Sequence, residues 1–315
     1  MTELDKNNDK HFFDDEIDII SLFKVLWEGK KTIILITSII AVLSVIYSLS
    51  LSNYYRSESI LVGAEPSNNS SLSQYSGLAS LAGVTLPSSG GDSVVEVMEV
   101  IKSRDFVKHL ITFENVLPSI IAAKSYDAVS KELYFDPKVY DKESKTWTRE
   151  ETEYYQSKPS YLEAHGAYVQ GILSISQDKK TGLVKIMVEH ISPVFAKDFL
   201  ELIIHEANNL KREKDIASSN KALSHLKNEL SKTPLVEIKE SINQLIKSQL
   251  ETQTIAVINE EYSLAIIEPP FVPEIKSRPS RAIICILATM LGGLFSLVVV
   301  LVRHYFLGRE IIKKD

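Results

Sequence analysis

The stretch TIILITSIIAVLSVIYSLSL occupies residues 32–51 and contains no charged side chain. A second uncharged stretch, AIICILATMLGGLFSLVVVLV, occupies residues 282–302. About twenty helical residues at about 1.5 Å each extend roughly 30 Å, which is the thickness of the hydrocarbon core of a bilayer. The two stretches therefore predict two transmembrane helices. Residues 52–281 then form a domain on one side of the membrane, and both tails lie on the other side.

The basic residues beside these stretches predict the orientation of the chain. They precede the first stretch and follow the second: Lys24, Lys30, Lys31, Arg303, Arg309, Lys313 and Lys314. An excess of Lys and Arg next to a span marks its cytoplasmic side. Lys276, Arg278 and Arg281 precede the second stretch and weaken this bias, but a long loop is translocated largely regardless of its charge. We expect the tails, residues 1–31 and 303–315, in the cytoplasm and residues 52–281 outside it.

A cleaved signal peptide is the alternative interpretation of residues 32–51, because Ser48 and Ser50 are small enough to precede a cleavage site. The apolar run is longer than the core of a signal peptide, however, and a polar, acidic tail precedes it. We therefore expect an uncleaved anchor.

The tail before the first stretch predicts an amphipathic helix. Ile17, Ile20, Phe23 and Trp27 recur at three- and four-residue spacing, so one face of a helix here is apolar. Such a helix is expected to lie on the membrane surface, with Trp27 at the level of the headgroups. Binding of a partner protein by the same face is the alternative.

The composition excludes one class of partner and one kind of covalent link. The net charge of the 315 residues is −6, whereas nucleic-acid binding usually requires a basic surface, so no nucleic-acid partner is expected. The single cysteine, Cys285, lies in the second apolar stretch. The domain between the stretches therefore contains no disulfide, and packing alone must stabilise it.

This domain is expected to have an α+β fold with a small mixed sheet. Tyrosines and β-branched residues predict a strand over residues 54–64. Alternating apolar and polar residues predict a hairpin formed by residues 171–176 and 183–190. Asp178 and Gly182 suit its turn, since glycine adopts a positive φ without strain.

The regions before the hairpin have weaker patterns. Residues 66–93 are rich in Ser, Gly and Asn, which predicts a loop, and the small apolar patch Gly77–Val84 interrupts it. Residues 93–113 have the period of one helix. Residues 138–159 are charged and aromatic without a clear period, and we interpret them as an excursion on the surface.

A long helix is predicted after the hairpin, over residues 193–232. Ser192 can cap this helix, Pro193 suits its first turn, and no proline or glycine follows before Pro234. Its length of roughly 60 Å exceeds what a domain of this size can bury. A second helix, about residues 235–260, returns toward the membrane, and a short strand after it is expected to pair with the first strand.

Three groups of residues are candidates for interactions with other chains or between helices. The first is an apolar stripe on the long helix, formed by Leu223, Leu226 and Leu230. The second is a proline-rich segment that we interpret as an extended linker, with Pro269, Pro270, Pro273 and Pro279. The third is the pair of adjacent glycines in the second span, Gly292 and Gly293. The stripe is expected to pack on other copies of the chain or on the returning helix. The glycines either allow close packing of the spans or merely fill the helix, and the GxxxG spacing is missing.

The sequence contains no recognisable catalytic constellation. It lacks the P-loop GxxxxGK[ST], the zinc motif HExxH, CxxC and GxSxG. The seven histidines are scattered, and none is paired at ligand spacing along a helix. We therefore expect no enzyme activity, no cofactor and no metal.

The order of several segments resembles the Wzz-type chain-length determinants, the polysaccharide co-polymerases of bacterial envelopes. EIDIISLFKVLWEGKKTIILI is similar to the start of that family, and SGLASLAGV to a segment after the first strand. ISQDKKTGLVKIMVEHISPVFAKDFLELIIHEAN resembles the hairpin that leads into the long helix. EPPFVPEIKSRPSR, followed by a span with glycines, resembles the proline-rich exit.

The resemblance implies a non-catalytic protein of the bacterial inner membrane. Members of the family form rings with a periplasmic domain, and they set the modal length of a lipid-linked polysaccharide made by a Wzy-type polymerase. The chain would then act on O-antigen or a related polymer as a homo-oligomer. Its tail after Val302 has Tyr305 as the sole tyrosine, unlike the kinase-bearing relatives.

Two other functions are alternatives. One is a receptor that signals inward, which a tail without a kinase, HAMP-like or methylation helix disfavours. The other is a transmembrane adaptor that activates a separate tyrosine kinase in capsule or exopolysaccharide export, with the tails binding that kinase.

Overall fold

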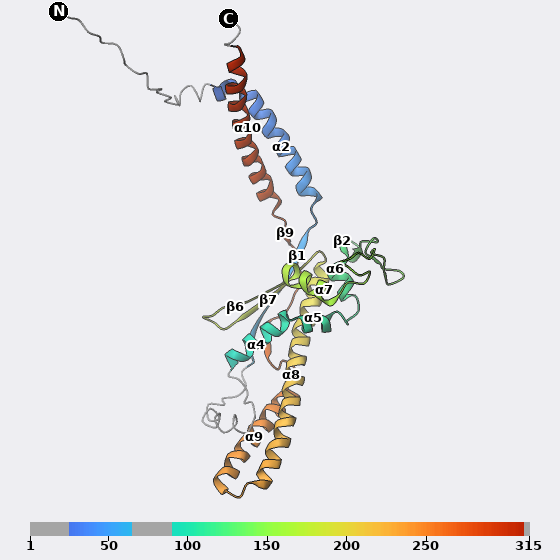
Figure 1. The fold of residues 1–315 in the computed structure, drawn as a ribbon, viewed down its shortest axis with the longest axis vertical. Helices are drawn as coiled ribbons and strands as arrows, with labels where there is room; N and C mark the ends of the chain where they lie inside the picture. The colour runs from blue at the N-terminus through green and yellow to red at the C-terminus, as the bar shows by residue number, and fades with distance from the viewer. Residues whose placement is uncertain (1–24, 65–89, 312–315) are drawn as a thin grey trace, which may run out of the picture. The chain divides into compact units, whose positions relative to one another are not determined.

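The computed structural model describes residues 25–64 and 90–311 (Figure 1). The chain divides into two units, one formed by residues 1–51 with 279–315 and the other by residues 52–278. Ile17, Ile20 and Phe23 of the predicted amphipathic helix lie outside the described residues. The predicted apolar patch Gly77–Val84 lies outside them as well.

The described part of the first unit contains two long helices, α2 (Lys30–Ser50) and α10 (Arg281–Ile311). Both are long and apolar enough to cross a membrane, α10 over Arg281–His304. Large apolar side chains such as Ile34 and Leu291 are mostly exposed on them, as side chains that face lipid are. The expected pair of apolar helices, one on each side of an α+β domain in the sequence, is confirmed.

The second unit is built on an antiparallel sheet. Its strands are β1 (Tyr54–Gly63), β6 (Leu173–Gln177), β7 (Val184–His190), β8 (Leu264–Glu268) and β9 (Lys276–Arg278). The order is β6-β7-β1-β8, and β9 also pairs with β1. The long contact is between β1 and β7, whose register runs from Tyr55 opposite His190 to Leu61 opposite Val184. The predicted pairing of the short strand before the proline-rich segment, β8, with β1 is confirmed.

Two small hairpins and several short helices complete this unit. The hairpins are β2 (Ala123–Asp127) with β3 (Glu132–Phe135), and β4 (Tyr140–Asp141) with β5 (Thr146–Trp147). The helices are α4 (Gly90–Lys102), α5 (Arg104–Leu110), α6 (Val116–Ile121), α7 (Tyr161–Ala167) and a π-helical turn at Tyr168–Ile172.

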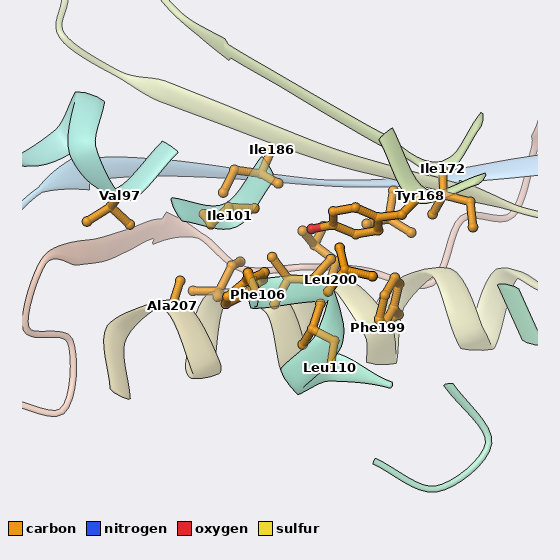
Figure 2. Close-up of a cluster of buried hydrophobic side chains, with 14 of the residues drawn as sticks. Val97, Ile101, Phe106, Leu110, Tyr168, Ile172, Ile186, Phe199, Leu200 and Ala207 are labelled. Carbon is orange, nitrogen blue, oxygen red and sulfur yellow. The ribbon is translucent and has the colours of Figure 1, made fainter. Parts of the chain in front are cut away.

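The hydrophobic core lies between the sheet and the first half of α8 (Pro193–Lys232) (Figure 2). Alternate residues of β7, Val184, Ile186 and Val188, are fully buried, as the period of a half-buried strand requires. From α8, Phe199 and Leu200 point into the same cluster. Figure 2 also labels Ala207 of α8 and six side chains from α4, α5 and the π-helical turn: Val97, Ile101, Phe106, Leu110, Tyr168 and Ile172.

Helix α8 begins and ends at the residues that the sequence predicts. The Ser192 hydroxyl accepts a hydrogen bond from the backbone N–H of Phe195 (3.2 Å), and Pro193 is the first residue of the helix. The helix ends at Lys232, shortly before Pro234. Helix α9 (Val236–Ile258) then returns along the second half of α8, so these two helices form a hairpin (Figure 1).

The β6–β7 turn also has the expected chemistry. Gly182 adopts a φ of +75°, and its N–H donates to the carbonyl of Asp178 (2.8 Å). The Asp178 side chain accepts from the N–H of Lys180 (2.8 Å). The predicted hairpin is confirmed, except that Gly171 belongs to the π-helical turn and β6 begins at Leu173.

Three expectations are wrong. Residues 93–113 are not one helix, because Ser103 adopts an extended conformation and its hydroxyl caps α5 through Phe106 N–H (3.2 Å). Residues 138–159 are not only a surface excursion, because Tyr140 is buried against Trp147 with ring centroids 4.9 Å apart. The proline-rich segment is not only a linker, because β9 lies within it.

Candidate functional site

The contact between α2 and α10 gives the two glycines of the second span different surroundings. These helices lie side by side (Figure 1). A Cβ atom at residue 292 would lie 2.8 Å from Cγ2 of Ile40, so the helices approach this closely only because residue 292 is glycine. A Cβ atom at residue 293 would meet nothing within 4 Å. Of these two glycines, only Gly292 is a packing position against the described residues.

Small hydroxyl residues continue the face of Gly292. Ser296 is fully buried four residues later, its hydroxyl donates to the carbonyl of Gly293 (2.7 Å), and Thr37 of α2 lies 3.5 Å from it. On α2 the buried residues are Ser44 and Ser48. Gly292 and Ser296 thus form the small-xxx-small spacing of closely packed membrane helices. The sequence shows this spacing only when serine is counted with glycine as a small residue.

The apolar stripe on α8 is largely covered by α9. Leu226 is fully buried, Leu223 is nearly so, and Leu230 is half-buried. Their partners on α9 are Ile242 and Leu245. The stripe therefore stabilises the α8–α9 hairpin. The large apolar side chains that remain exposed on or beside α9 are Leu235, Val236, Ile238, Leu250, Val257 and Ile258.

The middle of the hairpin is polar. Ser219 of α8 and Ser248 and Gln249 of α9 are almost completely buried. Among the described residues, neither the Ser248 hydroxyl nor the Gln249 side-chain nitrogen has a hydrogen-bond partner. A buried polar group without a partner costs about 1–3 kcal/mol, so this part of the hairpin is less stable than the leucine cluster.

Ion pairs join α4 to the middle of α8. Lys211 lies 2.9 Å from Glu96 and 3.1 Å from Asp215, and Lys214 lies 2.8 Å from Glu96. The hydrogen bonds from Lys214 and Lys211 lower the pKa of the Glu96 carboxyl. The Tyr262 hydroxyl donates to Asp215 (2.9 Å), which connects the segment after α9 to α8.

Three histidines of the domain, His109, His190 and His205, form hydrogen bonds within it. Glu206 of α8 lies 2.6 Å from Nε2 of His109 and 2.9 Å from Nδ1 of His205. His190 is buried, and its Nδ1 accepts from the N–H of Ser192 (3.1 Å). No group of three His, Cys, Asp or Glu side chains suited to a metal ion occurs in the part of the chain that the structure describes.

The proline-rich segment follows one edge of β1. The Ser59 hydroxyl donates to the carbonyl of Glu268 (2.7 Å), and the Ser57 hydroxyl to that of Phe271 (2.7 Å). Prolines have no N–H for a strand ladder, so these hydroxyls replace ladder bonds. Pro273 is buried, Pro270 and Pro279 are half-buried, and Pro269 is exposed. Strand propensity alone does not identify Ser57 and Ser59 as residues that contact the proline-rich segment. The only indication in the sequence is their spacing, because alternate residues of a strand share a face and Ser57, Ser59 and Leu61 are two residues apart.

The predicted interaction residues thus lie in three separate places. Gly292 faces α2, the leucines face α9, and the prolines run beside β1.

Comparison with known proteins supports the resemblance that the sequence suggests. Residues 15–113 match the family model described as "Wzz: Chain length determinant protein", which confirms the resemblance to the chain-length determinants over this region. A solved structure titled "full-length bacterial polysaccharide co-polymerase" shares 14% identity and covers 92% of this chain and 99% of its own, with a TM-score of 0.42. No curated protein matches the chain.

Proposed function

We propose that this chain is a non-catalytic regulator of the length of a bacterial surface polysaccharide, O-antigen or a related polymer. The observation that carries the proposal is the match of residues 15–113 to the chain length determinant family. The matched region includes α2, β1, α4 and α5, and therefore the first apolar helix and the beginning of the domain.

The proposed location is the inner membrane, crossed twice, with residues 1–31 and 303–315 in the cytoplasm and residues 52–281 in the periplasm. The apolar helices α2 and α10 and the lysines before α2 support this topology. Alkaline phosphatase fused at residue 160 should be active, whereas a fusion after Asp315 should be inactive. The reverse pattern would contradict the topology.

The proposed partners are further copies of the chain, a Wzy-type polymerase and its lipid-linked product. The exposed apolar side chains of α9, Val257 and Ile258 among them, support self-association, because contiguous exposed apolar residues mark interaction surfaces. Native mass spectrometry in mild detergent should show a ring of several copies. A monomer at working concentration would contradict this part of the proposal.

Deletion of the gene, followed by a polysaccharide ladder gel, tests the function. The expected result is polymer of altered length distribution, because a regulator without catalytic groups does not form the glycosidic bonds. Complementation with the wild-type chain should restore the original distribution. Loss of all polymer would contradict the proposal and favour an essential role in export or synthesis.

The two adjacent glycines provide a matched pair of variants for the same assay. Gly292→Leu places a side chain against Ile40 and should separate α2 from α10. A Cβ atom at residue 293 meets no described residue within 4 Å, so Gly293→Leu serves as the control. At equal protein level, Gly292→Leu should shift the length distribution and Gly293→Leu should leave it unchanged. Equal effects of the two substitutions would show that contact between α2 and α10 does not matter.

A further inference from the structure

The carboxylate of Glu189 on β7 collects contacts from two other strands. Glu189 is 9% exposed, and its Oε2 lies 2.5 Å from Nη2 of Arg278 on β9. Its Oε1 accepts a hydrogen bond from the Ser277 hydroxyl on β9, and it lies 3.6 Å from Nη2 of Arg56 on β1. One almost buried acid thus neutralises two arginines that come from opposite ends of the domain sequence.

Strand β9 makes further side-chain contacts with the beginning of β1. The Arg278 guanidinium lies over the ring of Tyr54, 5.1 Å from its centroid. The Ser277 hydroxyl is also 3.1 Å from the carbonyl oxygen of Tyr54, and Lys276 Nζ is 3.5 Å from the side-chain oxygen of Asn53. Each residue of β9 is therefore held by its side chain as well as by its backbone.

The backbone ladder of β9 is weak by itself. The strand comprises only Lys276–Arg278, its register against β1 shifts between Tyr54 and Tyr55, and Pro279 follows it without an N–H. A strand of this length is marginal without side-chain contacts. The charge-assisted pair of Arg278 with the almost buried Glu189 is therefore expected to contribute to holding β9 on the sheet.

We propose that Glu189 is a positioning residue that fixes, next to each other, the two points where the chain leaves the domain for its apolar helices. The sequence runs from Leu51 at the end of α2 to Tyr54 within three residues, and from Arg278 to Arg281 at the start of α10 within three. Because Tyr54 and Arg278 are register partners, Glu189 controls the spacing of both connections. The effect on polymer length rests on the proposed function, whereas the effect on spacing does not.

The test is a disulfide crosslink in the full-length protein in membranes. Tyr55 and Lys276 are register partners across β1 and β9, and Cα atoms of such pairs lie at distances that a disulfide can bridge. Tyr55→Cys and Lys276→Cys are introduced together with Cys285→Ser, which removes the native thiol. Glu189→Ala and Glu189→Gln should each slow oxidant-driven crosslinking by about tenfold or more, because each removes the charged carboxylate that pairs with Arg278 and holds β9 against the sheet.

A matched control exists on β1 and β7, the strands that carry Arg56 and Glu189. Glu58 of β1 and Lys185 of β7 form an ion pair of 2.8 Å that does not touch β9. Glu58→Gln should leave both crosslinking and polymer length unchanged. The exchange Glu189→Arg with Arg278→Glu restores one opposite-charge pair and should recover at least part of the crosslinking rate.

The two readouts separate the outcomes. Slower crosslinking together with altered polymer length in Glu189→Gln, but not in Glu58→Gln, supports the proposal. Unchanged crosslinking in both Glu189 variants overturns it, whatever the polymer does. Slower crosslinking with a wild-type length distribution overturns the link to polymer length. If deletion of the whole gene leaves polymer length unchanged, the proposed function has failed, and the crosslinking rate still decides the role of Glu189.

Discussion

The core of the domain and the α8–α9 hairpin use the same long helix in opposite ways. In its first half α8 packs against a sheet and several short helices, and Phe199, Leu200 and Ile203 are buried among many partners. In its second half its buried apolar cluster, among the described residues, is formed with α9, around Leu226 with Ile242 and Leu245. A continuous helix therefore connects a cooperative core to an arm whose stability depends on one small cluster and a polar layer. We expect the arm to open without unfolding the core.

The largest expected effect is in the core. Phe199→Ala removes a ring that lies 5.1 Å from that of Phe195 and 6.0 Å from that of Tyr168, measured between centroids. The free energy of unfolding should fall by about 3–5 kcal/mol, because a buried ring is replaced by a cavity. Urea unfolding followed by Trp147 fluorescence in a Trp27→Phe background measures it, since Trp147 packs against the core. A loss below about 1 kcal/mol would contradict a cooperative core that includes α8.

A pH change should produce the next largest effect, again in the core. Burial lowers the pKa of His190 from 6.5 to about 4. Nδ1 accepts from Ser192 N–H, so the neutral ring donates from Nε2 to the carbonyl of Ser119 (2.9 Å). Between pH 6.5 and 4 the unfolded chain binds the proton and the folded chain does not, so stability falls as the pH falls.

This loss should total about 3 kcal/mol across that window, at about 1.4 kcal/mol per pKa unit. Urea unfolding of the wild-type chain and of His190→Gln at a series of pH values measures it. Only the difference between the two proteins is attributed to His190, because every other group is common to both. Parallel curves for the two proteins would show that His190 does not carry the effect.

Leu226→Ala tests the stability of the arm, the α8–α9 hairpin, separately from that of the core. It removes a fully buried side chain from the cluster with Ile242 and Leu245, at a cost of about 2–3 kcal/mol within the hairpin. Hydrogen exchange of α9 amides should accelerate by about 30- to 150-fold, while amides of β7 keep the wild-type rate. Faster exchange in β7 as well would show that the core and the arm unfold together.

The sequence predicts the parts of this molecule that depend on local signals. Ser192, Pro193 and Pro234 determine where α8 begins and ends, and Gly182 determines the β6–β7 turn. Contacts between distant residues are harder to foresee. The break at Ser103 lies inside a helical period, and β9 forms because Arg278 meets Glu189 and Tyr54, which lie far away in the sequence.

The candidate interaction residues show the same limit. The sequence does not distinguish Gly292 from Gly293, because both are glycines in the same apolar stretch. The position of Ile40 on the neighbouring helix distinguishes them in the structure. The stripe of Leu223, Leu226 and Leu230 is recognisable from its spacing. Whether α9 or another copy covers it depends on the path of the returning chain, which the spacing of apolar residues does not specify.

The smallest expected effect is a gain in stability. Gln249 occupies a buried position of α9, seven residues after Ile242 and four after Leu245, where an antiparallel helix pair normally places an apolar side chain. Its side-chain nitrogen has no partner among the described residues. Gln249→Leu removes this unpaired group at similar volume and should stabilise the arm by about 1 kcal/mol. Hydrogen exchange of α9 should slow about fivefold while that of β7 stays constant. Faster exchange in α9 would mean that Gln249 meets a polar partner in the assembled protein, so that the polar layer serves association and not the single chain.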